Sequence, residues 1–219
     1  MPDFDADLND FQTAARLLHT ASEFGAIMEF GRYPQDSDGE IMPIKWLILH
    51  KNAGRVLLLS QWGLDSIPFS DRQGQSSWSR CSLRRWLNSD FCSQAFTNAE
   101  LSRIETVRLH NPANPLYDTV PDADTEDRIF LLSPLDVENY LERRDYRLCM
   151  ATPYAQRCGS DMYAGDEERF PGFYAWWWLR WPGYYGNASY MYSSGDIFND
   201  FAVDNQGGTV RPALWLKRQ

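Results

Sequence analysis

The chain has 219 residues, of which 43% are hydrophobic and 15% aromatic, and nine of them are Trp. This composition provides enough apolar surface for one sizeable core and excludes a disordered chain. The net charge of −9 argues against non-specific nucleic-acid binding and against attraction to anionic membrane surfaces, because both require a basic face.

The N-terminus and the cysteines bear on the compartment in which the protein is found. No apolar stretch approaches the roughly 20 residues that cross a bilayer, so we expect no membrane insertion. Residues 1–10 carry four Asp where a signal peptide would carry Lys or Arg and then an apolar run. We therefore expect a protein that is cytoplasmic as synthesised. Without a CxxC pair, its cysteines are expected to be reduced thiols; they are Cys81, Cys92, Cys149 and Cys158.

The first predicted elements are a helix and a hairpin. Apolar residues repeat at helical spacing over residues 8–19, which predicts an amphipathic helix. We expect the stretch 1–24 to dock on the following domain or on a partner. Residues 41–50 and 55–60 are apolar, β-rich runs separated by a short turn that contains Gly54, and they predict a β-hairpin.

Helices are predicted in the middle of the chain. Apolar spacing over 82–87 predicts one helix, and a capping box at 97–100 opens a second that continues through Ile104. A short buried strand is predicted at 129–132. The next residues, Ser133-Pro134, supply an N-cap and a Pro at the first helical position for a helix to about Arg143. Thr152-Pro153 repeats this pattern for a short helix that ends near Gly159.

The C-terminal part of the chain is rich in Trp, Tyr, Gly, Ser, Asn and Asp. Short apolar alternations separated by turn residues predict antiparallel strands there. These strands are expected at 176–179, 188–192, 197–203 and 209–216, with turns at Ser194-Gly195 and at 206–208. The sequence thus predicts one α+β domain over residues 25–219, with helices in the middle of the chain and β ribbons at both ends.

The common catalytic and metal-binding motifs are missing from the sequence. There is no HExxH, GxSxG, GxGxxG or GxxxxGK[ST], and the three His are scattered. Residues 122–127 have oxygen ligands at alternate positions, but Asp127 and Ser133 stand where a calcium loop needs Gly and Glu. A looser cation site there, or at Asp161 and 166–168, remains an alternative to solvated acidic turns. We therefore predict no enzymatic activity, no cofactor and no metal.

Two further features have structural interpretations. Within the run Trp176-Trp177-Trp178, adjacent side chains of a strand point to opposite faces, so at most alternate Trp share one face, and core packing is expected. Arg180 and Arg211 lie next to strand-like segments that end in Pro. For each, a buried guanidinium bonded to carbonyls or to a carboxylate is the expected arrangement.

The stretch between Gly183 and Asn205 contains no Lys, Arg, Glu or Gln. It uses the Tyr, Ser, Asn and Asp residues that dominate antibody paratopes, where rigid rings supply contact area at a low entropic cost. Small or aliphatic residues (Ala188, Met191, Ile197 and Val203) are expected to hold the backbone to the core while the other side chains face out. The alternative is a Tyr-rich β surface with no dedicated partner.

Several short motifs are spread over most of the chain. They are Phe30-Gly31-Arg32-Tyr33-Pro34-Gln35 with Gly39, Pro43-Ile44-Lys45-Trp46, 78–88 with Phe91 and Ala95-Phe96, 177–183, and 210–216. Through these motifs the chain resembles the bacterial domain-of-unknown-function family numbered 6273, some members of which look like variable proteins of diversity-generating retroelements. Trp181 and Phe201 depart from this pattern, since a small polar residue and a Gly are expected there.

The resemblance implies a C-type-lectin-like fold, related to the formylglycine-generating-enzyme group, with diversified positions just before the C-terminus. In such systems Asn codons of the AAY type become NNY, which encode Tyr, Ser, Asn, Asp and Phe. The expected function is therefore a non-enzymatic protein that binds an unknown protein or surface ligand through segment 181–205. The residues expected to form this surface are Trp181, Tyr184, Tyr185, Asn187, Tyr190, Tyr192, Phe198, Asn199, Asp200, Phe201 and Asp204.

Two alternatives to a diversified binding protein stay open. One is a structural or assembly module in which the N-terminal helix recruits a partner and the aromatic face is merely packed. The other is a formylglycine-generating-type oxidase, although that chemistry needs a reactive cysteine pair late in the domain and no Cys follows Cys158.

Overall fold

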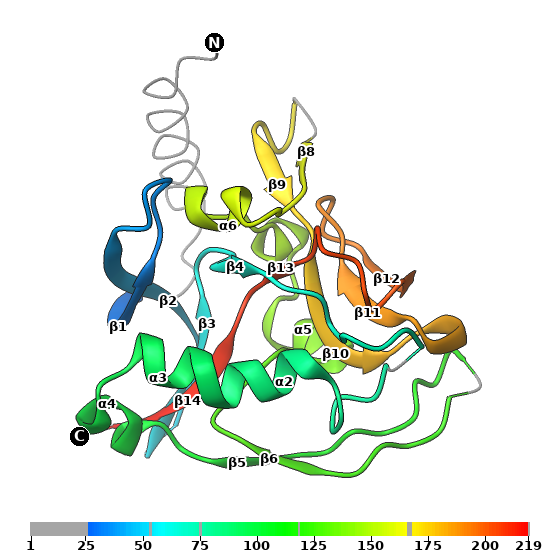
Figure 1. Ribbon diagram of the computed structural model, residues 1–219, viewed down its shortest axis with the longest axis horizontal. Coiled ribbons are helices and arrows are strands. Elements are labelled where there is room, and N and C mark those ends of the chain that lie inside the picture. The colour runs from blue at the N-terminus through cyan, green and yellow to red at the C-terminus, as the bar shows by residue number, and fades with distance from the viewer. Residues whose placement is uncertain (1–25, 53, 75, 118, 166–167, 219) are drawn as a thin grey trace.

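The structure is a computed structural model that describes residues 26–52, 54–74, 76–117, 119–165 and 168–218 (Figure 1). It is a mixed α+β structure in which most neighbouring strands are antiparallel and the helices are short. The helix expected over 8–19, and with it the docking stretch 1–24, lies outside the described residues.

The first sheet joins the N-terminal hairpin to the last strand of the chain. The predicted hairpin is confirmed, and its second strand pairs with the C-terminal strand from Leu59 opposite Ala213 to Arg55 opposite Lys217. In spatial order its strands are β1 (Ile27–Pro34), β2 (Ile41–Lys51), β3 (Arg55–Ser60), β14 (Ala213–Lys217) and β7 (Ile129–Phe130). All neighbours in this sheet are antiparallel. Strand β1 was not predicted.

The second sheet carries the Tyr-rich segment. In spatial order its strands are β12 (Ile197–Phe201), β11 (Ala188–Met191), β10 (Trp177–Pro182), β13 (Thr209–Val210) and β4 (Asp65–Ser66). The single strand expected over 209–216 is wrong, because the chain leaves the second sheet after Val210 and enters the first at Ala213. Pro212 lies at this crossing, where it has no N–H to give to either ladder.

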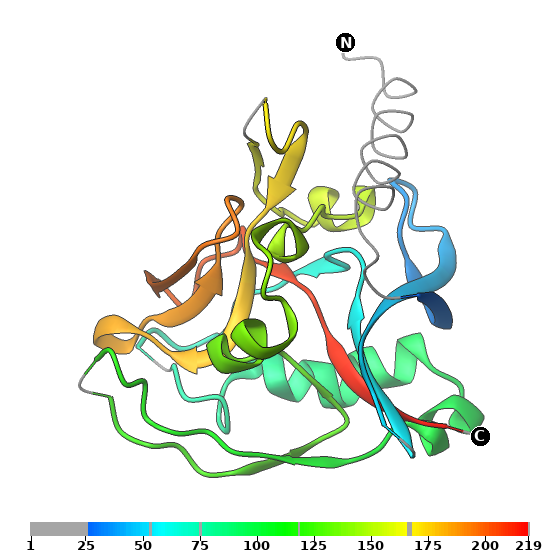
Figure 2. The ribbon, with the colours of Figure 1, turned by 180° about the vertical axis from the view of Figure 1, so that it is seen from behind.

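Helices flank the sheets on two sides (Figures 1 and 2). The π-helical turn η1 joins α2 and α3 in one rod, and the capping boxes expected at Thr97 and present also at Ser133 open α4 and α5. Helix α5 ends at Tyr140 rather than near Arg143. The helices are α2 (Ser82–Trp86), η1 (Leu87–Phe91), α3 (Cys92–Ala95), α4 (Asn98–Arg103), α5 (Pro134–Tyr140), η2 (Arg144–Arg147), α6 (Pro153–Arg157) and η3 (Tyr184–Gly186).

Two small hairpins that were not predicted extend from the sheets. One pairs β5 (Val107–Leu109) with β6 (Thr125–Asp127), and the other pairs β8 (Met162–Ala164) with β9 (Phe173–Ala175). The connection from β5 to β6 runs along the base of the molecule and approaches η3 in both views (Figures 1 and 2). The two hairpins therefore bring distant parts of the sequence beside the Tyr-rich segment.

The Trp run forms part of the core, as expected. Trp176, Trp177 and Trp178 are fully buried. The rings of Trp176 and Trp178 meet edge to face with centroids 4.7 Å apart, whereas Trp177 packs under the Arg211 guanidinium, 5.0 Å from its ring centre. Alternate Trp residues therefore share a face, as the geometry of a strand requires.

The interpretation of both arginines as structural is confirmed. Arg180 donates to the Leu131 carbonyl at 2.9 Å and to the Asp136 carboxylate. Arg211 is buried and its Nε donates to the Ser60 carbonyl at 3.0 Å. Both guanidinium groups therefore bond to neighbouring segments of the chain, and neither is exposed at the surface.

Candidate ligand-binding surface

The tight turn η3 between β10 and β11 presents two tyrosines to solvent. Tyr184 is 45% exposed and Tyr185 is 85% exposed. Their ring centroids lie 4.0 Å apart, and the ring of Tyr117 lies 5.6 Å from that of Tyr184. Tyr117 comes from the β5–β6 connection, so this aromatic cluster of Tyr117, Tyr184 and Tyr185 joins two distant segments.

The backbone of Tyr185 lies in the left-handed region, with φ 47° and ψ 47°. Among the described residues it is the only non-glycine residue with a positive φ. Gly186 follows with φ 80°, and a Cβ there would come within 3.0 Å of the backbone of Gly74. The close approach of the two glycines explains how this turn is held in place while Tyr185 projects outward.

A second aromatic group lies beyond the other end of β11. The ring of Tyr192 lies 5.8 Å from that of Phe198 and 5.5 Å from that of Tyr163, which belongs to the β8–β9 hairpin. Phe198 is 42% exposed and Tyr163 38% exposed. Since η3 precedes β11 and Tyr192 follows it, the segment presents two separate aromatic groups rather than one continuous face.

Two residues expected to face outward are buried, so that expectation is wrong for them. Tyr190 is 7% exposed, because its ring packs between those of Trp176 and Phe198. Asn199 is 8% exposed, and its Oδ1 accepts hydrogen bonds from Ser189 at 2.6 Å and from Asn114 at 3.1 Å. The bulge in the β11–β12 ladder and the packing of the β5–β6 connection place these side chains inside.

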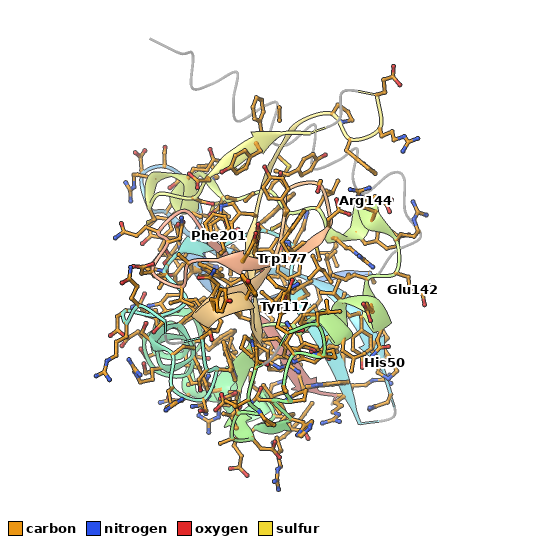
Figure 3. The ribbon with its side chains drawn as sticks, turned by 90° about the vertical axis from the view of Figure 1, so that its right-hand side faces the viewer. His50, Tyr117, Glu142, Arg144, Trp177 and Phe201 are labelled. Atoms are coloured by element: carbon orange, nitrogen blue, oxygen red, sulfur yellow. The ribbon has the colours of Figure 1, made fainter. Side chains whose placement is uncertain are left out.

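The other predicted residues fall into two groups. Asp200 and Asp204 are exposed. Trp181, Asn187 and Phe201 are half-buried; the Asn187 amide donates to the Asp200 carbonyl at 3.0 Å, and Phe201 stacks on Trp176 with centroids 4.2 Å apart. Figure 3 views the molecule from the side that carries β11 and β12, with Tyr117, Trp177 and Phe201 labelled.

The residues predicted to hold this segment to the core do so. Ala188, Met191 and Val203 are buried, and Ile197 is half-buried but packs against the same core. The predicted scaffold is therefore confirmed at all four positions. Its outward side chains are Tyr184, Tyr185, Phe198, Asp200 and Asp204, with Tyr192 and Trp181 partly exposed.

Sequence reasoning missed the contributions of other segments to this surface. Tyr117 and Tyr163 touch the Tyr-rich segment, and Leu116 and Val120 beside Tyr117 are 73% and 81% exposed. The signal in the sequence was the length of the β5–β6 connection, whose described residues, 110–117 and 119–124, form no helix or strand. Connections of that length in a compact domain are often functional.

The acidic run is divided among different partners. Asp122 accepts hydrogen bonds from Ser79, Asp124 pairs with Arg108 and His110, and Asp127 is buried against Arg84. Within the part of the chain that the structure describes, no group of three or more His, Cys, Asp or Glu side chains could hold a metal ion.

All four cysteines are free thiols in the structure. Cys81, Cys92 and Cys149 are buried, and burial raises the pKa of each thiol, to about 12 for Cys81 and about 11 for Cys92. Cys158 is exposed, and its thiol pKa is raised by partial burial and by the nearby Asp65 carboxylate. Such thiols carry little thiolate at neutral pH and are poor nucleophiles.

Comparison with known families identifies the chain. The model of the family described as Domain of unknown function (DUF6273) matches residues 53–218. The chain belongs to this family. The match to DUF6273 runs from the turn before β3 to the end of β14, so it includes both aromatic groups but leaves out β1 and β2. No curated protein and no solved structure matches the chain.

Within the described residues, no helix has both the length and the apolar character needed to cross a bilayer.

Proposed function

We propose that this DUF6273 protein is a non-enzymatic ligand-binding protein whose contact surface is the exposed part of segment 181–205. The observation that carries the proposal is Tyr185, which is 85% exposed and has a left-handed backbone. That conformation costs a non-glycine residue about 1–2 kcal/mol. If the ring at this position contributed nothing, Gly or Asn would adopt the same backbone at a lower conformational free energy.

The chemistry of the surface supports the same function. Tyr is enriched at binding hot spots because a ring buries much apolar area, loses few rotamers and keeps a hydroxyl at its tip. Tyr184 and Tyr185 together with Phe198 are among the exposed large hydrophobic side chains of the described residues. The raised pKa values of the cysteine thiols support a non-enzymatic role, because thiol oxidation chemistry favours low-pKa, accessible cysteines.

We further propose that the fold is C-type-lectin-like and that the outward positions of the segment are diversified. The support is the combination of a buried frame with exposed Tyr, Phe and Asp side chains that NNY codons encode. Sequencing of the neighbouring DNA tests diversification directly. A reverse-transcriptase gene and a near-repeat of codons 176–216 are expected, and their absence from this and related loci would contradict it.

The binding function is tested by replacing Tyr185 with Gly. A ligand is first selected from candidate partner proteins and bacterial surface extracts, and its Kd is measured with the full chain. Tyr185→Gly should weaken binding about thirtyfold, or about 2 kcal/mol, as expected for a hot-spot ring. The same change should leave the free energy of unfolding unchanged or raise it by up to about 1 kcal/mol, because Gly tolerates the left-handed backbone.

Leu135→Ser is the matched control, since Leu135 is 51% exposed but lies on α5, outside the segment. It should leave Kd unchanged. A ligand whose Kd ignores Tyr185→Gly and Tyr184→Ser, yet responds to changes elsewhere, would show that the surface has been assigned to the wrong place.

A further inference from the structure

The β5–β6 connection is fixed against the Tyr-rich segment rather than free. The buried Asn114 amide donates to the Pro182 carbonyl at 2.9 Å and to Asn199 Oδ1 at 3.1 Å. Tyr117 packs on Tyr184, as described above. At its other end, the connection is held to the residues before α2, because both Asp122 carboxylate oxygens accept hydrogen bonds from Ser79, at 2.6 and 2.7 Å.

An open pocket of about 370 Å³ lies next to the aromatic cluster. Three segments that lie far apart in the sequence line it: Gly74 with Ser76, Ser77 and Arg80; residues 119–122; and Pro182 and Gly183 with Tyr185 and Gly186. Val120, Pro121, Pro182 and Tyr185 contribute apolar groups, and Ser76, Ser77 and Arg80 contribute polar groups. The pocket therefore suits a group with one apolar and one polar end.

Arg80 gives the polar end a positive charge. Its Nε lies 3.4 Å from Ser77 Oγ, and within the part of the chain that the structure describes it takes part in no ion pair. A guanidinium presents a planar fork that matches a carboxylate in a bidentate arrangement. The hydroxyl of Ser76 can donate to the same anion, whereas that of Ser77 donates to the Asp122 carboxylate.

The one carboxylate in the pocket wall is already engaged. Asp122 accepts from the Ser79 N–H and hydroxyl and from the Ala123 N–H at 2.8 Å. Partial burial would raise the pKa of Asp122, but these donors outweigh it and the pKa is lowered. Asp122 therefore keeps its negative charge at neutral pH and positions the loop, and within the described residues it forms no ion pair with Arg80. The excess negative charge of the chain acts at longer range and is screened over about 8 Å at physiological salt.

We propose that this pocket binds a carboxylate joined to an apolar body, with Arg80 holding the carboxylate and Tyr185 and Val120 packing on the body. The chemistry is shared by the C-terminal end of a protein partner and by a free carboxylic acid. The inference rests on the proposed function, because Tyr185 belongs both to the proposed contact surface and to the lining of the pocket. It adds a fixed anchor site whose charged group, Arg80, and whose Val120 wall lie outside segment 181–205.

The test uses N-acetyl-phenylalanine as the probe and the full chain labelled with nitrogen-15. Titration followed through the amide signals gives Kd for the acid and for N-acetyl-phenylalanine amide, which has the same body without the charge. The acid should bind at least about tenfold more tightly than the amide, as expected for a charge-assisted bidentate contact. Titration with a hexapeptide of five Gly and a C-terminal Phe distinguishes the two sources of the carboxylate. If the peptide binds as tightly as the free acid, the ligand is the C-terminal end of a chain. If it binds more weakly, the ligand is a small carboxylic acid.

Arg80→Gln should weaken the acid about tenfold and leave the amide unchanged, while Arg80→Lys should fall between wild type and Arg80→Gln because it keeps the charge without the fork. Arg128→Gln, at an exposed arginine outside the pocket lining, is the matched control and should change nothing. Equal binding of acid and amide, or an Arg80→Gln variant that binds the acid as wild type does, would overturn the proposal. If that happens while Tyr185→Gly still weakens partner binding, the proposed function stands and only the pocket assignment fails.

Discussion

At the scale of single residues, neighbouring aromatic side chains in the second sheet have opposite roles. Trp178 is fully buried, its Nε1–H donates to the Ile67 carbonyl at 3.1 Å, and its ring meets that of Trp176. Tyr184, only six positions later, is exposed. Composition alone treats both as aromatic residues of one segment, whereas their surroundings make one a core residue and the other an exposed residue.

Trp178→Ala is therefore expected to lower the free energy of unfolding by about 3–5 kcal/mol, because the truncation leaves a large cavity and an unpaired carbonyl. Urea denaturation followed by circular dichroism measures the change. Tyr184→Ser is the control and should leave the transition midpoint unchanged. Tyr190→Ser should also lower the free energy of unfolding, since Tyr190 is buried. A Tyr190→Ser variant as stable as wild type would show that its ring is exposed after all.

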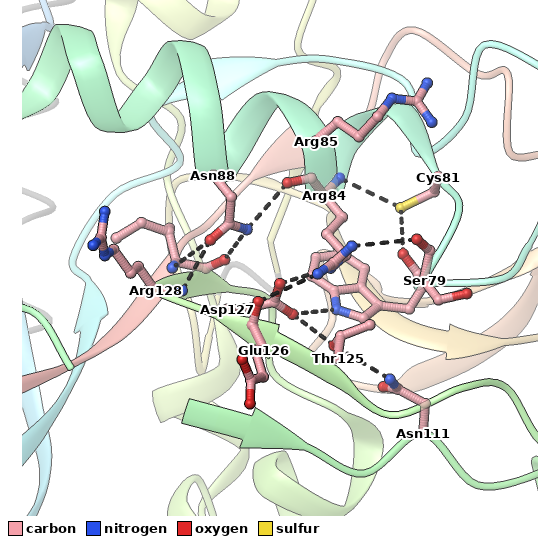
Figure 4. Close-up of polar contacts among 12 residues, drawn as sticks. Ser79, Cys81, Arg84, Arg85, Asn88, Asn111, Thr125, Glu126, Asp127 and Arg128 are labelled. Atoms are coloured by element: carbon pink, nitrogen blue, oxygen red, sulfur yellow. Dashed lines mark hydrogen bonds and ion pairs between the residues drawn. The ribbon is translucent and has the colours of Figure 1, made fainter. Parts of the chain in front are cut away.

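At the scale of elements, a buried carboxylate joins the α2 rod to the β5–β6 hairpin (Figure 4). Asp127 is fully buried and accepts hydrogen bonds from Arg84 Nε at 2.6 Å, Trp78 Nε1 at 3.0 Å and Thr125 Oγ1 at 2.7 Å. Asn88 adds a second link, because its Oδ1 accepts from the Arg128 N–H at 2.9 Å. The motif over 78–88 thus supplies the partners that hold the hairpin in place.

Asp127→Ala should lower the free energy of unfolding by about 3 kcal/mol, because it leaves the Arg84 guanidinium and the Trp78 indole without their partner. Asp124→Ala is the matched control: it lies on the same stretch and pairs with Arg108, but water surrounds the pair, so the effect should be far smaller. Urea denaturation of both variants checks the difference. Similar losses for the two substitutions would contradict a special role for the buried contact.

At the scale of the whole molecule, stability should depend on pH through Asp65, which lies where the β4 strand meets β1. Tyr33 donates to Asp65 Oδ2 at 2.6 Å and the Ser66 N–H to Oδ1 at 2.7 Å. Burial nevertheless outweighs these donors and raises the pKa of Asp65. A raised pKa means that the folded state favours the protonated carboxyl. The resulting stabilisation is complete below the unfolded pKa of about 3.9 and is lost as pH rises through the folded value.

Asp65→Asn removes this titration. The stability of the variant relative to wild type should therefore increase as pH rises from about 4 toward neutrality, by about 1.4 kcal/mol for each unit by which the pKa is raised. Denaturation curves of both proteins at several pH values measure it. Asp204→Asn, at an exposed carboxylate, serves as the control and should show no such trend. A relative stability that stays constant or falls with pH would contradict the assignment.

The sequence alone determined the features that depend on local chemistry. The apolar runs on either side of Gly54 form the β2–β3 hairpin, and the capping boxes at Thr97 and Ser133 fix the starts of α4 and α5, because a cap is satisfied within three residues. The motifs between residues 53 and 218 that suggested the family, such as 78–88, also needed no structure, and the family match bears them out.

Only the tertiary structure decided which elements meet. Strands β4 and β13 have two residues each, too few for any periodicity to show. The chain crosses from one sheet to the other at Pro212 because β13 pairs within the second sheet and β14 within the first. Tyr190 and Asn199 are buried because the Trp rings and Asn114 cover them, and these partners lie up to 85 positions away. The Arg80 pocket exists for the same reason: three distant segments form it, and no one of them carries its chemistry alone.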